Sequence, residues 1–396
     1  MKAEVVSLKD LFQIGSSKRV LKSQWKADGV PFYRGREVTR LAMDGFVSNE
    51  LFIAEDHYTE LANQYGVPKA GDIVITAIGT IGNSYIVQDG DRFYFKDASV
   101  LWLKKTSNVS SQFVNLWLKS PVFFDQLYRG NGATVDTLTI QKLQSVQIRI
   151  PSLPEQHRIV AILDEAFDGI ATAKANAEKN LQNARALFES HLQSVFRNRN
   201  WKWKTLGELC DGVEYGSSAK SKAEGGIPVL RMGNIQDGRL NWENLVYTDD
   251  KAEIDRYLLK HNDVLFNRTN SPELVGKTAI YKSEMPAIFA GYLIRIHRKE
   301  DLLDADYLTY FLNSQIAFDY GKTVVISSVN QANINGTKLK SYPIPAPSLS
   351  EQKAIVAKLN DLSEETQRLE SLYQQKLTAL DDLKKSLLHQ AFSGAL

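Results

Sequence analysis

Polar loops, most of which contain glycine, are the parts of this 396-residue sequence with the residue types best suited to chemistry. In the N-terminal half they are GSSKR (15–19), YRGRE (33–37), IGTIGNS (78–84) and RGNGATVDT (129–137). In the C-terminal half they are RMGNIQDGR (231–239), NRTNS (267–271) and SSVNQANING (327–336). Arg, Lys, Asn, Gln, Ser and Thr side chains bond to base edges, and Lys, Arg and backbone N–H groups near glycines bind phosphates. The loops therefore predict contacts with DNA.

The candidate DNA-binding residues share these side-chain types and lie in those loops. They are Lys18, Arg19, Arg34, Arg36, Thr80, Asn83, Arg129, Asn131, Thr134, Arg231, Asn234, Asn267, Arg268, Asn270, Ser328, Asn330, Gln331 and Asn333. The strongest candidates are Arg34, Arg36, Arg231, Asn267, Arg268, Asn330 and Gln331. Any one polar, glycine-rich loop is equally typical of an ordinary solvated turn. The occurrence of such loops at equivalent positions in both halves of the chain favours DNA contact.

Catalytic motifs would indicate an enzyme instead. A DNA adenine methyltransferase needs a glycine-rich turn for its adenosyl cofactor and an Asn/Asp-Pro-Pro-aromatic loop for the flipped base. The nearest fragment, NSPE (270–273), lacks the second proline and the aromatic residue, and neither a GxxxxGK[ST] phosphate loop nor an HExxH zinc motif occurs. Asp72 and Asp263 precede apolar strands at matching positions, which indicates a structural turn in each half. We therefore expect no catalytic residue, no metal site and no cofactor.

The composition is that of a globular protein with two or three domains, with 43% hydrophobic and 24% charged residues. The formal net charge is only +2, so attraction to DNA must come from local basic patches. Cys210 is the single cysteine, which rules out an internal disulfide and a cysteine-cluster zinc site. The N-terminal residues lack the apolar run of a signal peptide, and no segment approaches the roughly 18 apolar residues of a membrane span. We expect a cytoplasmic protein.

The candidate loops are carried by two copies of one sequence unit. KLQSVQIRIPSLPEQ (142–156) matches KLKSYPIPAPSLSEQ (338–352), and GVPFYRGREV (29–38) resembles GIPVLRMGNI (226–235). Self-similarity with a period near half the chain length indicates a tandem duplication. The duplication predicts one scaffold that presents two different surfaces.

Each copy has two parts with different periodicities. Residues 1–150 and 200–346 contain short β-rich runs broken by Gly, Asn and Asp, which predict two globular domains of mixed α/β structure. Residues 151–199 and 347–396 carry apolar residues at spacings of three and four, which predict two long helices. Each helix begins with Ser-Leu-x-Glu, the spacing of a capping box, at Ser152 and at Ser348.

The apolar stripe on each long helix is narrow, which is typical of a coiled-coil seam. Two halves that arose from one duplicated unit pack naturally with pseudo-two-fold symmetry, so the helices are expected to be antiparallel. The chain termini then become neighbours, and the repeated PSL-x-EQ string becomes the junction between globular part and helix. The expected fold class is α+β, with two globular domains separated by an antiparallel pair of long helices.

This order of variable domain, P-x-L-x-E-Q-x-x-I-V-A-x-L junction and long helix, repeated once, resembles the DNA specificity subunit of a bacterial type I restriction–modification system. The likeness covers essentially the whole chain. It implies that residues 1–150 and 200–346 are target recognition domains, each of which reads one half of a split sequence in double-stranded DNA. It also implies that the helices form a spacer and a docking surface for two DNA methyltransferase subunits, which a restriction and translocase subunit can join.

Two alternatives remain open from the sequence. The chain can be the recognition subunit of a related system in which methylation and cleavage share one partner polypeptide. It can also be a coiled-coil scaffold that joins two protein-binding or RNA-binding domains. The identity of the copurifying partner distinguishes these alternatives.

Overall fold

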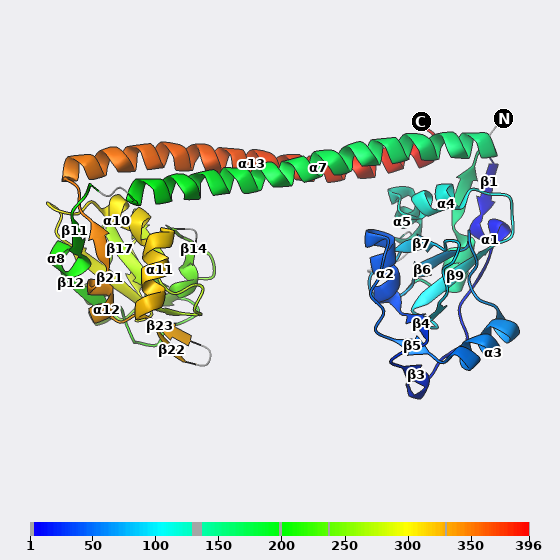
Figure 1. The fold of residues 1–396 in the computed structure, drawn as a ribbon, viewed down its shortest axis with the longest axis horizontal. Helices are drawn as coiled ribbons and strands as arrows, with labels where there is room; N and C mark the ends of the chain where they lie inside the picture. The colour runs from blue at the N-terminus through cyan, green and yellow to red at the C-terminus, as the bar shows by residue number, and fades with distance from the viewer. Residues whose placement is uncertain (1–3, 129–136, 198–199, 237, 329–330, 396) are drawn as a thin grey trace. The chain divides into compact units, whose positions relative to one another are not determined.

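The computed structural model describes residues 4–128, 137–197, 200–236, 238–328 and 331–395, and the chain forms two compact units (Figure 1). Unit 1 contains residues 1–178 and 375–396, and unit 2 contains residues 179–374. Each unit therefore combines one globular part with portions of both long helices. The predicted segment boundaries after residues 150 and 346 fall just before the first turns of those helices.

The globular part of unit 1 alternates short strands and helices. Its strands are β1 (Glu4–Ser7), β2 (Phe12–Gly15), β3 (Trp25–Lys26), β4 (Val30–Tyr33), β5 (Phe52–Ile53), β6 (Ile73–Thr76), β7 (Ser84–Ile86), β8 (Tyr94–Phe95), β9 (Val100–Lys105) and β10 (Gln147–Ile150). Its helices are α1 (Leu8–Leu11), η1 (Lys22–Gln24), α2 (Gly35–Asp44), α3 (Glu55–Tyr65), α4 (Ser111–Leu118), α5 (Pro121–Tyr128) and α6 (Ile140–Ser145).

The globular part of unit 2 follows a similar order. Its strands are β11 (Trp203–Thr205), β12 (Cys210–Tyr215), β13 (Ile227–Leu230), β14 (Ile235–Gln236), β15 (Arg239–Leu240), β16 (Val246–Thr248), β17 (Asp263–Asn267), β18 (Thr269–Asn270), β19 (Thr278–Tyr281), β20 (Ile288–Phe289), β21 (Leu293–Arg298), β22 (Ile326–Ser328), β23 (Gln331–Asn333) and β24 (Pro343–Pro345). Its helices are α8 (Leu206–Leu209), η2 (Met232–Asn234), α9 (Lys251–Tyr257), α10 (Ala305–Leu312), α11 (Gln315–Val324) and α12 (Gly336–Lys340).

The sheets of the two globular parts have matching topologies. Unit 1 has a four-stranded sheet in the order β2-β9-β6-β7, and unit 2 has one in the order β12-β21-β17-β19. The terminal pair β1-β10 corresponds to β11-β24, and the group β5-β4-β8 corresponds to β16-β13-β20, with a parallel pairing at the same place in each. The duplication read from the sequence is therefore a duplication of the fold.

Asp72 and Asp263 close the same turn before the central strand of each four-stranded sheet. The Asp72 carboxylate accepts a hydrogen bond from the Lys69 N–H at 3.0 Å, and Asp263 accepts one from the Lys260 N–H at 2.8 Å. The structural role predicted for the two carboxylates is confirmed. Their second partners differ, because Asp72 bonds to the Trp102 indole and Asp263 bonds to the Arg295 guanidinium.

The repeated PSL-x-EQ string joins each globular part to its helix through a buried glutamine. In unit 1 the Gln156 side chain accepts from the Ser110 N–H at 2.9 Å and donates to the Pro151 carbonyl at 2.9 Å. In unit 2 Gln352 accepts from the Asp304 N–H at 2.8 Å and donates to the Pro347 carbonyl at 3.0 Å. A buried side-chain amide needs hydrogen-bond partners, and each glutamine has them here. Replacement of the glutamine would remove both bonds at its junction.

The long helices are α7 (Leu153–Phe196) and α13 (Leu349–Ser393), and they pair antiparallel within each unit. In unit 1, Lys174 bonds to Asp381 at 2.7 Å, while Leu163 near the start of α7 shares a core with Phe392 at the end of α13. In unit 2, Arg185 bonds to Glu370 at 2.8 Å. The predicted antiparallel direction is confirmed in both units.

Two details of the helix predictions are corrected. The capping box forms at α13, where the Ser348 N–H donates to Glu351 at 2.9 Å, but at α7 the Glu155 carboxylate accepts from Arg158 instead. Not every apolar residue with the seam spacing is buried: Leu383 is 46% exposed, whereas Leu388, Ala391 and Phe392 near the end of α13 are buried.

Both chain termini belong to unit 1, as expected from antiparallel helices (Figure 1). Val5 in β1 pairs with Arg149 in β10, and the Arg149 guanidinium lies against Gly394 so closely that a Cβ at residue 394 would collide with it. The end of α13 therefore packs beside the first strand of the chain.

Candidate nucleic-acid interface

Two of the candidate loops in unit 2 meet in one small sheet. Strand β18 pairs antiparallel with β23, with Thr269 opposite Asn333 and Asn270 opposite Ala332. Strand β23 in turn pairs with β22, with Ser328 opposite Gln331. This β18-β23-β22 sheet lies at the end of the unit away from α13 (Figure 1). The structure thus brings together two stretches that are far apart in the sequence and that both carry candidate residues.

Arg268 lies directly before β18, and several segments fix its position. Its backbone N–H donates to the Tyr292 carbonyl at 3.0 Å, and its carbonyl accepts from the Ile334 N–H at 2.9 Å. Its guanidinium lies over the ring of Tyr215 with the central carbon 4.9 Å from the ring centroid, and Nη1 donates to the Gly291 carbonyl at 3.1 Å. Among the described residues no carboxylate forms an ion pair with Arg268, so its positive charge is not neutralised locally.

The other candidates around this sheet have partners of their own. Asn333 donates to the Thr269 hydroxyl at 2.8 Å, and Asn270 accepts from the Ser271 N–H at 2.9 Å. Both side chains are partly exposed. Asn330, also a strong candidate, lies outside the described residues.

Asn267 and Asn234 are candidates that the fold buries. Asn267 is fully buried at the end of β17, and Asn234 is 3% exposed. The Asn234 amide donates to the carbonyls of Asn241 and Glu243 at 3.0 and 3.1 Å, so it ties the β14-β15 hairpin to the segment that follows. A buried amide does not reach a base edge, and we retain neither residue as a candidate contact.

Unit 1 has the same strand-end arrangement with different side chains. Ile78 pairs with Thr137 where Thr269 pairs with Asn333 in unit 2, and the Leu138 N–H donates to Ala77 just as Ile334 donates to Arg268. The neighbouring candidate Thr80 is exposed. Asn83 is partly exposed and donates to the Thr39 hydroxyl at 3.0 Å. Arg129, Asn131 and Thr134 lie outside the described residues.

Arg34 and Arg231 occupy equivalent positions, and both begin a helical turn. The Arg34 N–H donates to the Glu37 carboxylate, and the Arg231 N–H donates to the Asn234 amide oxygen, each at 2.9 Å. The Arg34 guanidinium also binds Glu37, through Nη2 at 2.8 Å, whereas that of Arg231 donates to the Asn244 carbonyl at 2.7 Å. Both strong candidates are thus engaged in holding the local backbone.

Arg36 shares the acidic partners of Arg34. It bonds to Glu37 at 3.1 Å and forms an ion pair with Glu50. Burial opposes ionisation of Glu37, yet the hydrogen bonds from Arg34 and Arg36 prevail and lower its pKa. These paired charges weaken the attraction that the loop would exert on DNA.

Lys18 and Arg19 are exposed, in the loop between β2 and η1. The ammonium of Lys18 lies 5.5 Å from the centroid of the Tyr65 ring, and Arg19 is 3.9 Å from the Asp97 carboxylate. A pair at such a distance between exposed groups is weak, so both side chains can turn toward a phosphate.

The sequence-based reasoning missed two aromatic residues beside Arg268. Tyr215 is 42% exposed and Tyr292 is 48% exposed, although large aromatic side chains usually bury more of their surface. Each is adjacent to a glycine that permits close backbone approach, Gly216 and Gly291. Paired Tyr-Gly and Gly-Tyr dipeptides near polar loops are the signal that would have drawn attention to them.

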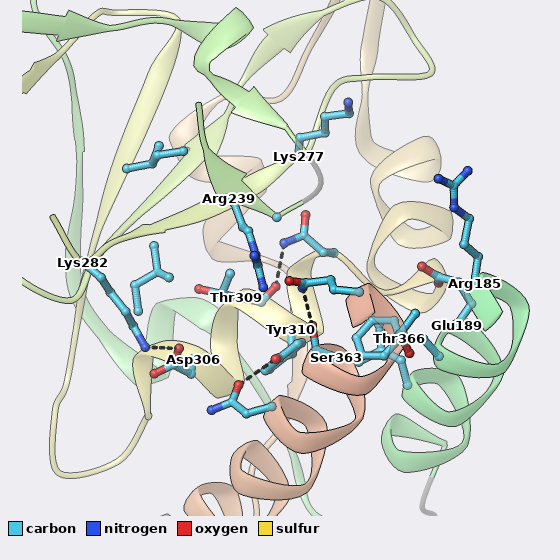
Figure 2. Close-up of a pocket in the computed structure, with 18 of the residues that line it drawn as sticks. Arg185, Glu189, Arg239, Lys277, Lys282, Asp306, Thr309, Tyr310, Ser363 and Thr366 are labelled. Atoms are coloured by element: carbon cyan, nitrogen blue, oxygen red, sulfur yellow. Dashed lines mark hydrogen bonds and ion pairs between the residues drawn. The ribbon is translucent and has the colours of Figure 1, made fainter. Parts of the chain in front are cut away.

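A cavity of about 920 Å³ in unit 2 lies between α10, the β14-β15 hairpin and the parts of α7 and α13 in that unit (Figure 2). Several of its charges pair with one another, as Lys282 does with Asp306 at 2.5 Å, and the Tyr310 hydroxyl donates to Asn360 at 2.7 Å. Burial raises the pKa of Glu189 at its edge. Packing of the globular part against the helices accounts for these pairs, and we place no candidate site here.

No cluster of three or more His, Cys, Asp or Glu side chains in the described part of the chain is placed to hold a metal ion. No helix among the described residues is both long and apolar enough to cross a membrane.

Two copies of one mixed α/β domain, each followed by a long helix and each with polar loops at matching strand ends, define a duplicated recognition module. The chain belongs to the family of type I restriction modification DNA specificity domains, whose model matches residues 2–182 and 198–379. This confirms the family resemblance drawn from the repeated junction.

Named relatives carry the same description. A putative type I restriction enzyme specificity subunit of Haemophilus influenzae is 36% identical over 163 residues, which are 41% of this chain and 40% of that protein. The EcoKI specificity subunit of Escherichia coli K12 is 25% identical over 317 residues, or 74% of this chain and 67% of that protein. The chain thus aligns with less than half of the Haemophilus relative.

A solved structure shows the same fold. It describes complex assembly and conformational transition of a type I R-M system, and one of its chains matches with a TM-score of 0.79. The match covers 100% of this chain and 98% of that one at 19% identity. At this identity the likeness establishes the architecture, which agrees with the expected α+β fold with two globular domains and long helices.

Proposed function

We propose that this chain is the DNA-recognition subunit of a type I restriction–modification complex and that it is not itself catalytic. Each globular part reads one half of a split sequence in double-stranded DNA. The single observation that supports this most strongly is the matched strand-end arrangement, Ile78 with Thr137 in one copy and Thr269 with Asn333 in the other. The backbone pairing is the same at both places, but the side chains on it differ. Different side chains are what recognition of two different half-sites requires.

The partners that we propose are two DNA methyltransferase subunits and a restriction and translocase subunit, which the family relationship suggests. The long helices have extensive exposed polar faces outside their seam and are the proposed docking surface. The family match favours a DNA target over a scaffold for protein or RNA, and no cofactor is assigned to this chain. We place the complex in the cytoplasm, where chromosomal and incoming DNA are both accessible.

Methyl transfer should require this chain together with a partner. The purified chain alone is expected to transfer no methyl groups to DNA and to hydrolyse no nucleotide, because its sequence carries neither a glycine-rich cofactor turn nor a phosphate loop. Addition of the DNA methyltransferase that copurifies with the tagged chain is expected to give sequence-specific methylation, measured with a radiolabelled methyl donor.

The matched control is the methyltransferase without this chain, which is expected to be inactive on the same DNA. Turnover by the isolated chain would contradict the assignment. So would equal methylation by the partner in the presence and absence of the chain.

A further inference from the structure

Arg268 has no carboxylate partner among the described residues, in contrast to several other arginines of the molecule. Arg34 and Arg36 bind Glu37, and Arg295 binds Glu214 and Asp263. Arg268 is instead held by neutral groups, the Tyr215 ring and the Gly291 carbonyl. A guanidinium that is fixed in space and keeps its charge is suited to bind an acceptor from outside the protein.

The support under Arg268 is itself rigid. The Tyr215 hydroxyl accepts from the Gly336 N–H at 2.7 Å, which fixes the ring at its outer end. At its inner end, a Cβ on residue 216 would collide with the Phe289 carbonyl oxygen, so the backbone after Tyr215 is tightly packed. A cation–π contact on such a platform holds the plane of the guanidinium as well as its position.

These contacts leave some donors of the guanidinium without a hydrogen-bond partner. Nε is buried, so the edge formed by Nε and Nη2 is not accessible to a ligand. Nη1 uses one of its two hydrogens on Gly291, and Nη2 has no hydrogen-bond partner among the described residues. Nη2 and the second hydrogen of Nη1 are therefore the donors that remain for a ligand.

Two parallel donors in one plane match the O6 and N7 acceptors of guanine in the major groove, which is the commonest specific arginine contact. A phosphate also accepts two parallel bonds from such a fork, so the choice between base and phosphate depends on the neighbouring side chains. Asn270 and Asn333 are partly exposed and lie on the paired strands β18 and β23 next to Arg268, one on each face of the sheet, so amide groups that can bind a base edge occur close to it in the chain or across the pair. These observations favour a base over a phosphate.

We propose that Arg268, positioned by Tyr215 and Gly291, recognises a guanine in the half-site read by unit 2. The inference rests on the proposed function and extends it from a domain to one base. Tyr215 is a positioning residue in this scheme, since it acts through the arginine.

The test is a map of methylated bases in cells that carry the whole complex with one altered chain. Arg268→Ala and Arg268→Lys are each expected to lower methylation of the original motif about 10- to 100-fold and to relax the preference for G at one position of one half-site. The other half-site should be unchanged. Tyr215→Leu should relax the same position, while Tyr215→Phe, which keeps the ring, should retain the preference.

Arg256→Ala is the matched control, because Arg256 also lies over a tyrosine in unit 2, 5.0 Å from the Tyr257 ring, but belongs to α9 and not to the β18-β23-β22 sheet. It should leave the motif intact. Arg268→Lys keeps a long cationic side chain but lacks the paired N–H donors of the guanidinium. It therefore tests the role of those donors even if Arg268→Ala lowers the amount of folded protein.

Three results would overturn the inference. Equal loss of methylation at every sequence would indicate a phosphate contact. Relaxed base preference at an A·T position would contradict guanine recognition. An unchanged motif would show that Arg268 does not contact the DNA. In each of these cases the wild-type chain still directs methylation to a split motif, and the proposed function stands. If even the wild-type chain directs none, the proposed function itself fails.

Discussion

Exchange of residues 1–150 for the equivalent domain of another family member is expected to change one half of the recognised DNA sequence completely and to leave the other half unchanged. The reason is that residues 1–150 form their own sheets and contain buried clusters that involve neither long helix, and all the candidate residues of the N-terminal half are in this range. The chain leaves this part at the Pro151 junction, where Gln156 bonds to a backbone N–H that any donor domain can supply.

The exchanged domain has to pack against both long helices, because residues of α7 and α13 belong to the main core of unit 1. Phe113 contacts Phe392, with ring centroids 5.1 Å apart, so the donor domain has to present a large apolar residue at the place of Phe113. A map of methylated bases in cells with the hybrid reads out both half-sites. The reciprocal exchange of residues 200–346 is the matched control and should change only the opposite half. A simultaneous change in both halves would show that the globular parts do not read independently.

Phe392→Ala is expected to lower the stability of unit 1 by about 3–5 kcal/mol, the usual cost of removing a buried phenylalanine side chain. Phe392 is 6% exposed near the end of α13 and belongs to the main core of unit 1, together with residues from β2, β6, β9 and α4. The last turns of the chain thus stabilise its first domain. Thermal unfolding, with hydrogen exchange of α4 as a local probe, measures the effect.

Leu383→Ala is the control on the same helix, because that side chain is 46% exposed. Leu383→Ala should lower the free energy of unfolding far less than Phe392→Ala, since it removes little buried surface. Equal destabilisation by the two substitutions would contradict the packing of α13 on the globular part. Unchanged protection of α4 in Phe392→Ala would contradict it as well.

The architecture could be predicted from the sequence because the sequence contains two copies of the same unit. The PSL-x-EQ junction occurs at the start of both long helices, and the spacing of apolar residues shows that these helices have a partner. Duplication then suggests the antiparallel direction, which the Lys174–Asp381 and Arg185–Glu370 pairs confirm within their units. The capping prediction worked for Ser348 but failed for Ser152, because Arg158 competes for the Glu155 carboxylate.

The candidate interface could be predicted only as a set of loops. Residue type does not show whether a polar side chain at the end of a strand is buried or exposed. Asn267 and Asn234 were therefore chosen as candidate DNA contacts although both are buried. Arg34 and Arg36 look available in the sequence, but Glu37 and Glu50 neutralise them. The stacking of Arg268 on Tyr215 depends on strands that meet only in the folded chain, and no local pattern records it.

The central claim is that this chain alone decides which two-part DNA sequence its complex modifies. The most direct test maps methylated bases across the genome of the source organism with the chain present, deleted and restored. We expect one split motif, with two defined halves and a fixed gap, that disappears on deletion and returns on restoration. A methylation pattern that stays the same without the chain, or a dependent motif that is continuous and not split, would contradict it.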